Sequence, residues 1–192
     1  MVNKKNQGFS LAELIIVIAV IAILGTGLIQ VSGVWDGWRV TKCSNLMEST
    51  WNKAKMQALS KGNVAGVEFY QLKGTYYAAI VTEIDKTKEP TSVFDLSSPD
   101  RVLETVELGK SPITMTVTLK NVDGETTLTL TDNSSISSLK NVAAFAFNRS
   151  SGAIKSVTLN GKDSNFTRMT AGNSRKTIHY SIANATGKIT QE

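Results

Sequence analysis

One carboxylate stands inside a long apolar segment near the N-terminus of this 192-residue chain. Glu13 follows Gly8 and Phe9, and the sequence after it runs without a charge from Leu14 to Ile29. An ionised carboxylate in lipid costs up to roughly 3 kcal/mol, so such a residue usually has a partner of opposite charge. If the peptide bond after Gly8 were cut, Phe9 would carry a cationic amine one helical turn from Glu13. That amine could form an ion pair with Glu13 of a neighbouring subunit.

The apolar segment has the length of a membrane span. A helix needs about 20 apolar residues, at a rise of 1.5 Å each, to cross the core of a bilayer. Lys4 and Lys5 precede the segment without a nearby acidic residue, so the positive-inside rule keeps the first residues in the cytoplasm. Everything after Ile29 is then expected outside.

The basic leader, the Gly8-Phe9 junction and Glu13, five positions into the segment that begins at Phe9, together resemble the N-terminal signal of type IV pilins and type II secretion pseudopilins. The resemblance implies cleavage after Gly8 by a prepilin peptidase, N-methylation of Phe9 and use of Glu13 in assembly. The implied partners are the prepilin peptidase, other pilins or pseudopilins in a filament, the inner-membrane assembly platform, and membrane lipid before assembly. The implied location is the bacterial cytoplasmic membrane, crossed once with the C-terminal domain outside, and then a cell-surface or periplasmic filament.

Two other interpretations of this segment are less favoured. A secretory signal peptide has an apolar core of about 7 to 15 residues and a small-residue cleavage site, whereas this core is longer and begins with a carboxylate. An ordinary single-pass anchor would tolerate Glu13 at its edge but has no use for the Gly8-Phe9 junction. A static anchored surface domain therefore stays an alternative to a filament subunit.

The sequence divides into a leader (residues 1–8), a membrane or filament-core helix (9–33) and an exported domain (34–192). The net charge is +5, and Lys4 and Lys5 would leave with the leader. Cys43 is the only cysteine, so no intrachain disulfide is available, and its place on an apolar helical face predicts a small buried side chain. His179 is the only histidine and lies in an alternating segment without a nucleophile motif. We therefore expect no catalytic set and no cofactor.

The helix is expected to continue from the membrane segment to Lys61, with Gly62 as the residue after its end. Apolar residues recur at steps of three and four along one face of this second half: Val40, Cys43, Leu46, Met47, Trp51, Ala54 and Ala58. Four glycines, at positions 25, 27, 33 and 37, are its expected weak points. Trp35 and Trp38 fit a membrane interface, a filament contact or the domain core.

From residue 63 onward, short segments rich in β-branched and aromatic residues alternate with turn signals. The predicted strands are 64–70, 75–82, 102–108, 113–121, 125–131, 142–147, 154–159, 177–182 and a short strand after Gly187, while 85–100 and 161–174 are predicted loops. The predicted fold is α+β and pilin-like, with a long N-terminal helix packed on an antiparallel β-sheet.

Residues 51–58, 142–148, 178–182 and 187–189 loosely resemble the GspH/FimT type of minor pseudopilin, and a major pilin stays an alternative. DNA-binding members of that type share a C-terminal Gly-Arg-x-Arg stretch. The matching positions, Gly187 to Thr190, keep a single cation in Lys188. Convergence of Arg168, Arg175 and Lys176 on that end would favour a DNA-uptake pilus, so nucleic acid is kept as a less favoured partner.

Two acidic turns offer oxygen atoms that could bind calcium. They are Asp123-Gly124-Glu125 and Asp132-Asn133-Ser134. Neither matches the twelve-residue EF-hand loop, and turn formation explains both, so no metal is predicted.

Overall fold

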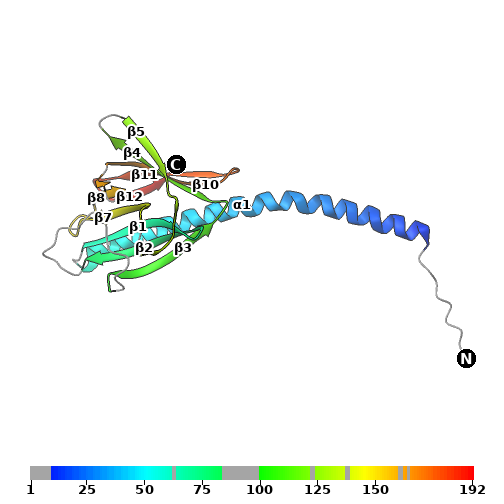
Figure 1. Ribbon diagram of the computed structural model, residues 1–192, viewed down its shortest axis with the longest axis horizontal. Coiled ribbons are helices and arrows are strands. Elements are labelled where there is room, and N and C mark those ends of the chain that lie inside the picture. The colour runs from blue at the N-terminus through cyan, green and yellow to red at the C-terminus, as the bar shows by residue number, and fades with distance from the viewer. Residues whose placement is uncertain are drawn as a thin grey trace, which may run out of the picture.

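The computed structural model describes residues 10–61, 64–83, 100–121, 124–136, 139–159, 162–163 and 165–192, and within the helix it leaves out the side chains of residues 24–34. It contains one long helix and two antiparallel sheets, so the predicted α+β class is confirmed. Figure 1 shows the first half of the helix projecting away from the sheets and the second half lying against them.

Helix α1 (Leu11–Lys61) contains 51 residues and is about 77 Å long at 1.5 Å per residue. It ends at the predicted residue, Lys61, whereas Gly62 lies outside the described residues. The helix is unbroken through the four glycines of its middle part, and Figure 1 shows a gentle curve there. The glycines therefore permit bending without interrupting the helix.

The strands form two sheets instead of the single sheet that was predicted. Their bounds are β1 (Val64–Leu72), β2 (Thr75–Glu83), β3 (Val102–Lys110), β4 (Thr114–Asn121), β5 (Gly124–Thr129), β6 (Asp132–Asn133), β7 (Val142–Phe147), β8 (Ile154–Leu159), β9 (Lys162–Asp163), β10 (Asn165–Gly172), β11 (Thr177–Ala183) and β12 (Lys188–Gln191). One sheet has the order β3-β2-β1-β7-β8-β9, with β6 beside β1, and the other has the order β12-β11-β10-β4-β5. Every pairing is antiparallel except that of β1 with β6.

The second half of α1 supplies the apolar face that both sheets cover. The predicted helix-face residues Val40, Cys43, Met47, Trp51, Ala54 and Ala58 are all fully buried, and Leu46 is partly buried. Trp51 lies at the centre of the core, with its ring centroid 4.9 Å from that of Phe145 and 5.1 Å from that of Phe147. Its indole N–H donates to the carbonyl of Gly187 at 3.0 Å, so the helix is also tied to the last turn of the domain.

Glycine stands at a positive φ in three of the turns between predicted strands. Gly74 (φ 74°) joins β1 to β2, Gly152 (φ 66°) precedes β8, and Gly187 (φ 59°) precedes β12. These values lie in the left-handed region, which glycine enters without the penalty that a Cβ imposes. The β4–β5 hairpin also forms, although its turn residues 122–123 lie outside the described residues.

The predicted loop at 161–174 is wrong, because β9 and β10 occupy most of it. β10 is a central strand of the second sheet, paired with both β4 and β11. Its inward residues Met169 and Ala171 are fully buried, so tertiary pairing outweighs a locally polar sequence. The other predicted loop, 85–100, lies almost entirely outside the described residues.

Among the described residues, no helical stretch combines the length and the apolar character that a membrane crossing requires.

Candidate functional site

The projecting half of α1 exposes large apolar side chains. Leu11 is 78% exposed and Ile23 is 72% exposed, and seven further residues between them are about half exposed or more: Leu14, Ile15, Ile16, Val17, Ile18, Val20 and Ile21. No described part of the folded domain covers this surface, because the helix here extends beyond both sheets (Figure 1). An apolar surface of this extent on one element marks contact with lipid or with another chain.

Glu13 lies in the first turn of α1 and caps it together with Ser10. The backbone N–H of Ser10 donates to Glu13 Oε2 at 2.9 Å, and the backbone N–H of Glu13 donates to Ser10 Oγ at 3.2 Å. This reciprocal arrangement is a capping box, which satisfies two N–H groups that a helix start leaves unpaired. The Ser-x-x-Glu spacing is visible in the sequence, whereas Glu13 was predicted only as a charge in an apolar segment.

The residues predicted for cleavage and methylation precede this cap in the sequence. Gly8 and Phe9 lie outside the described residues, which begin at Ser10. Residues 3–29 match the family model of the prokaryotic N-terminal methylation motif. The chain carries the type IV pilin and pseudopilin signal. No curated protein and no solved structure has a significant match to the chain.

The matched motif overlaps helix α1, which also contributes to the core of the folded domain. The matched residues 3–29 cover the start of α1 and its exposed apolar stretch, whereas the fully buried residues of α1 begin at Val40. Among the side chains that the structure describes, those of residues 11–23 are exposed, whereas residues from Val40 onward contribute to the core of the folded domain.

The four basic residues considered for DNA contact do not form one cluster. Arg175 and Lys176 lie at the β10–β11 turn, whereas Lys188 begins β12 near the opposite end of β11. The seven residues of β11 separate these two positions by roughly 20 Å. Arg168 lies on β10 and forms an ion pair with Glu192 at 3.3 Å, which partly neutralises its charge.

The second acidic turn has structural partners. Asp132 Oδ1 accepts a hydrogen bond from the backbone N–H of Gly74 at 3.1 Å. The side-chain amide of Asn133 donates to the carbonyl of Gln71 at 2.9 Å, and its oxygen accepts from the backbone N–H of Lys140 at 2.8 Å. In the other turn, Asp123 lies outside the described residues. The part of the chain that the structure describes contains no group of three residues able to hold a metal.

Cys43 and His179 occupy structural positions. Cys43 is fully buried, as predicted, and burial raises the pKa of its thiol to about 12. His179 is partly buried on β11, with its Nδ1 atom 3.2 Å from Thr170 Oγ1. Ser44 and Tyr180 form a buried hydrogen bond between α1 and β11, and burial raises the pKa of the Tyr180 hydroxyl. The bond between Ser44 and Tyr180 joins the helix to the second sheet.

Proposed function

We propose that the chain is a structural subunit, a minor pilin or pseudopilin, of a type IV pilus or a type II secretion pseudopilus. In this proposal a prepilin peptidase cleaves after Gly8, Phe9 is N-methylated, and residues 9–33 hold the protein in the cytoplasmic membrane until assembly. The exported domain of residues 34–192 then forms the outer part of the filament. The observation that carries the proposal is the methylation motif on a helix whose first half is exposed and apolar.

The free energy gained by covering the exposed apolar side chains of α1 supports a subunit that moves from one apolar environment to another. Covering an aliphatic side chain contributes about 1.5 kcal/mol or more, so the nine large residues between Leu11 and Ile23 represent on the order of 10 kcal/mol. Lipid covers this surface before assembly, and helices of neighbouring subunits cover it in a filament. Because both environments are apolar, the exchange itself has a small net cost.

Glu13 would favour the assembled filament over the lipid-embedded single chain. In the single chain, its carboxylate accepts from the Ser10 amide at 2.9 Å. In the assembled state we propose that the carboxylate pairs with the methylated amine of Phe9 on a neighbouring subunit. A charge-assisted hydrogen bond is stronger than a neutral one, and in an apolar setting it would favour the assembled register.

Replacement of Glu13 tests this role. Glu13→Val should leave cleavage and membrane insertion intact, because the change removes the charge that burdens the span, but should lower the amount of subunit in sheared filaments. Ser10→Ala is the matched control, since it removes one half of the capping box and keeps the carboxylate. Ser10→Ala should assemble nearly as well as the unchanged protein.

The amounts of subunit in membranes and in sheared filaments, measured by immunoblot, decide the result. Equal incorporation of Glu13→Val and the unchanged protein would contradict the proposed pairing. Equal losses for Glu13→Val and Ser10→Ala would instead assign the effect to the helix cap.

A further inference from the structure

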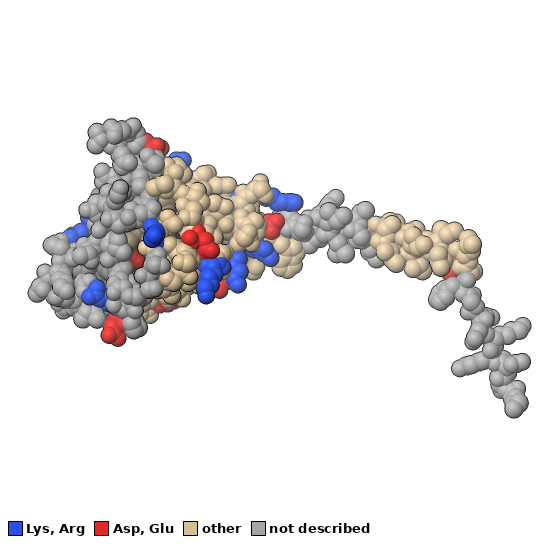
Figure 2. Space-filling model, viewed as in Figure 1, with Lys and Arg blue, Asp and Glu red and all other residues tan. Residues whose placement is uncertain are grey.

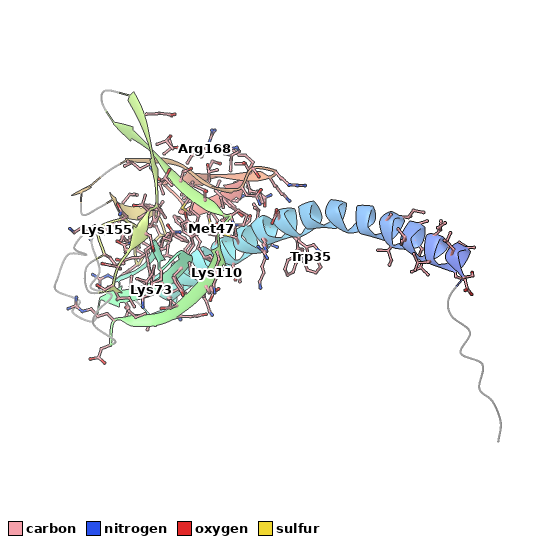
Figure 3. All side chains as sticks on the ribbon, turned by 45° about the vertical axis from the view of Figure 1, so that its right-hand side comes forward. Trp35, Met47, Lys73, Lys110, Lys155 and Arg168 are labelled. Atoms are coloured by element: carbon pink, nitrogen blue, oxygen red, sulfur yellow. The ribbon has the colours of Figure 1, made fainter. Side chains whose placement is uncertain are left out.

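Two tryptophan side chains stay exposed where α1 leaves the folded domain. Trp35 is 59% exposed and Trp38 is 57% exposed, so neither belongs to the core of this chain. Their rings meet edge to face, with centroids 6.4 Å apart. Figure 3 shows Trp35 projecting from α1 away from both sheets. Exposed aromatic rings of this size, placed side by side, indicate a surface that another molecule covers.

Basic side chains stand beside the two rings. Lys42 Nζ lies 5.6 Å from the centroid of the Trp38 ring, within the range of a cation–π contact. Trp38, Arg39 and Lys42 line one wall of a groove of about 540 Å³, and the end of β3 with Lys110 lines the other. Glu107 also lines the groove, 3.8 Å from Lys110.

A second basic pair reaches α1 from the β10–β11 turn. Lys176 Nζ donates to Thr41 Oγ1 at 2.7 Å, and the Asn173 side chain donates to the carbonyl of Asp36 at 2.9 Å. These bonds hold the turn, with the exposed Arg175, against the same section of the helix.

We call the five basic residues at this end of the domain the basic collar: Arg39, Lys42, Lys110, Arg175 and Lys176. Figure 2 shows basic side chains on both sides of the helix where it enters the domain. The acidic residues of the same region, Asp36 and Glu107, are fewer, so the collar has an excess of positive charge.

The position of the collar along α1 matches the headgroup layer of a membrane. If the span ends at residue 33, Trp35 lies about 3 Å and Trp38 about 8 Å beyond it at 1.5 Å per residue. The polar layer on each side of the hydrocarbon core is roughly 5–8 Å thick, which is where tryptophan is enriched. Lys42 lies about 14 Å beyond residue 33, and its long side chain can reach back toward the phosphates.

We infer that Trp35, Trp38 and the basic collar bind the headgroups of anionic phospholipids in the outer leaflet of the membrane. The indole rings lie among the headgroups, and the cations of the groove contact lipid phosphates. The surface thereby holds the exported domain upright on the bilayer before the subunit enters a filament. This inference rests on the proposed function, because it requires residues 9–33 to lie in the membrane.

Fluorescence quenching tests the inference with the full mature chain. The protein is reconstituted into phosphatidylcholine vesicles with or without phosphatidylglycerol, and the lipids carry bromine close to the headgroup as a quencher. Trp51 is fully buried and provides the unquenched background, measured with the Trp35→Phe/Trp38→Phe variant. Quenching of the unchanged protein should increase when phosphatidylglycerol is present.

Two double variants distinguish the effect of the collar residues from the effect of the total positive charge of the protein. Lys42→Gln/Lys110→Gln should reduce quenching in phosphatidylglycerol vesicles to the level seen in phosphatidylcholine. Lys155→Gln/Lys188→Gln removes the same charge from two exposed positions away from the collar and should leave quenching unchanged. Unaltered circular dichroism in both variants shows that the fold is kept.

Four results would overturn the inference. Quenching that does not depend on phosphatidylglycerol, or that falls equally in both double variants, would remove the collar as a lipid site. Release of the protein from the same vesicles by alkaline carbonate would refute the membrane span itself, and with it the inference. Retention without quenching would refute the inference alone and would point to a filament neighbour as the molecule that covers the rings.

Discussion

Gly187→Ala is expected to be among the most damaging single changes in the folded domain. Gly187 has a φ of +59°, and a Cβ added there would lie 2.1 Å from the carbonyl oxygen of Gly152. Its own carbonyl accepts the buried indole N–H of Trp51 at 3.0 Å, so a shift of this turn also disturbs the centre of the core. The Gly152 carbonyl belongs to the backbone, so it cannot move aside as the end of a flexible side chain could.

The expected loss in the free energy of unfolding has three parts. A left-handed conformation costs an alanine about 1–2 kcal/mol, relief of the backbone clash about 1–3 kcal/mol, and weakening of the buried indole hydrogen bond about 1 kcal/mol or more. Together they give roughly 3–6 kcal/mol, which is a large share of the 5–15 kcal/mol that stabilises a typical domain.

Gly74→Ala provides the matched control. Gly74 has a similar φ of +74°, but a Cβ there would meet nothing within 4 Å. Only the conformational part applies, so the loss should be about 1–2 kcal/mol. Urea unfolding of the folded domain, or of the full chain in detergent, followed by circular dichroism, measures the loss of stability in both variants. Equal losses for the two variants would refute the close packing of the β7–β8 and β11–β12 turns.

Three further predictions concern the folded domain. A fragment beginning at Val34 should be soluble and monomeric, and it should show mixed helix and strand by circular dichroism with or without reductant; aggregation under all conditions would place the boundary elsewhere. Cys43 should resist alkylation in the folded state and react after unfolding. Its contribution to the free energy of unfolding should be full below pH 9.0 and fall toward pH 12, because the thiol of the folded chain keeps its proton at pH values where the thiol of the unfolded chain has lost it. The fragment should bind duplex DNA weakly at physiological salt, because Lys188 lies far from Arg175 and Lys176; micromolar binding in a mobility-shift titration, lost on replacing these three residues with alanine, would contradict this.

The sequence predicted the features that depend on local periodicity and turn chemistry. Residues of α1 at steps of three and four, from Val40 to Ala58, form the buried face, because a helical repeat places them on one side. Lys73-Gly74 forms a two-residue hairpin, because both residues adopt positive φ. Such signals lie within a few residues of one another and need no knowledge of the rest of the fold.

Features that depend on distant pairing were missed. β10 has few apolar residues, and it becomes a strand because β4 and β11 supply partners on both sides. The separation of the strands into two sheets arises in the same way. The Ser10–Glu13 capping box at the start of α1 was not predicted, although its Ser-x-x-Glu spacing is a local signal in the sequence.

The N-terminus of the mature protein tests the central claim most directly. When the chain is produced together with an active prepilin peptidase, intact mass and N-terminal peptide analysis should find a protein that begins with N-methylated Phe9. Replacement of Gly8 by a bulky residue should block this change and leave the leader in place. An intact Met1 terminus beside an active peptidase, or cleavage that tolerates the Gly8 replacement, would contradict the account.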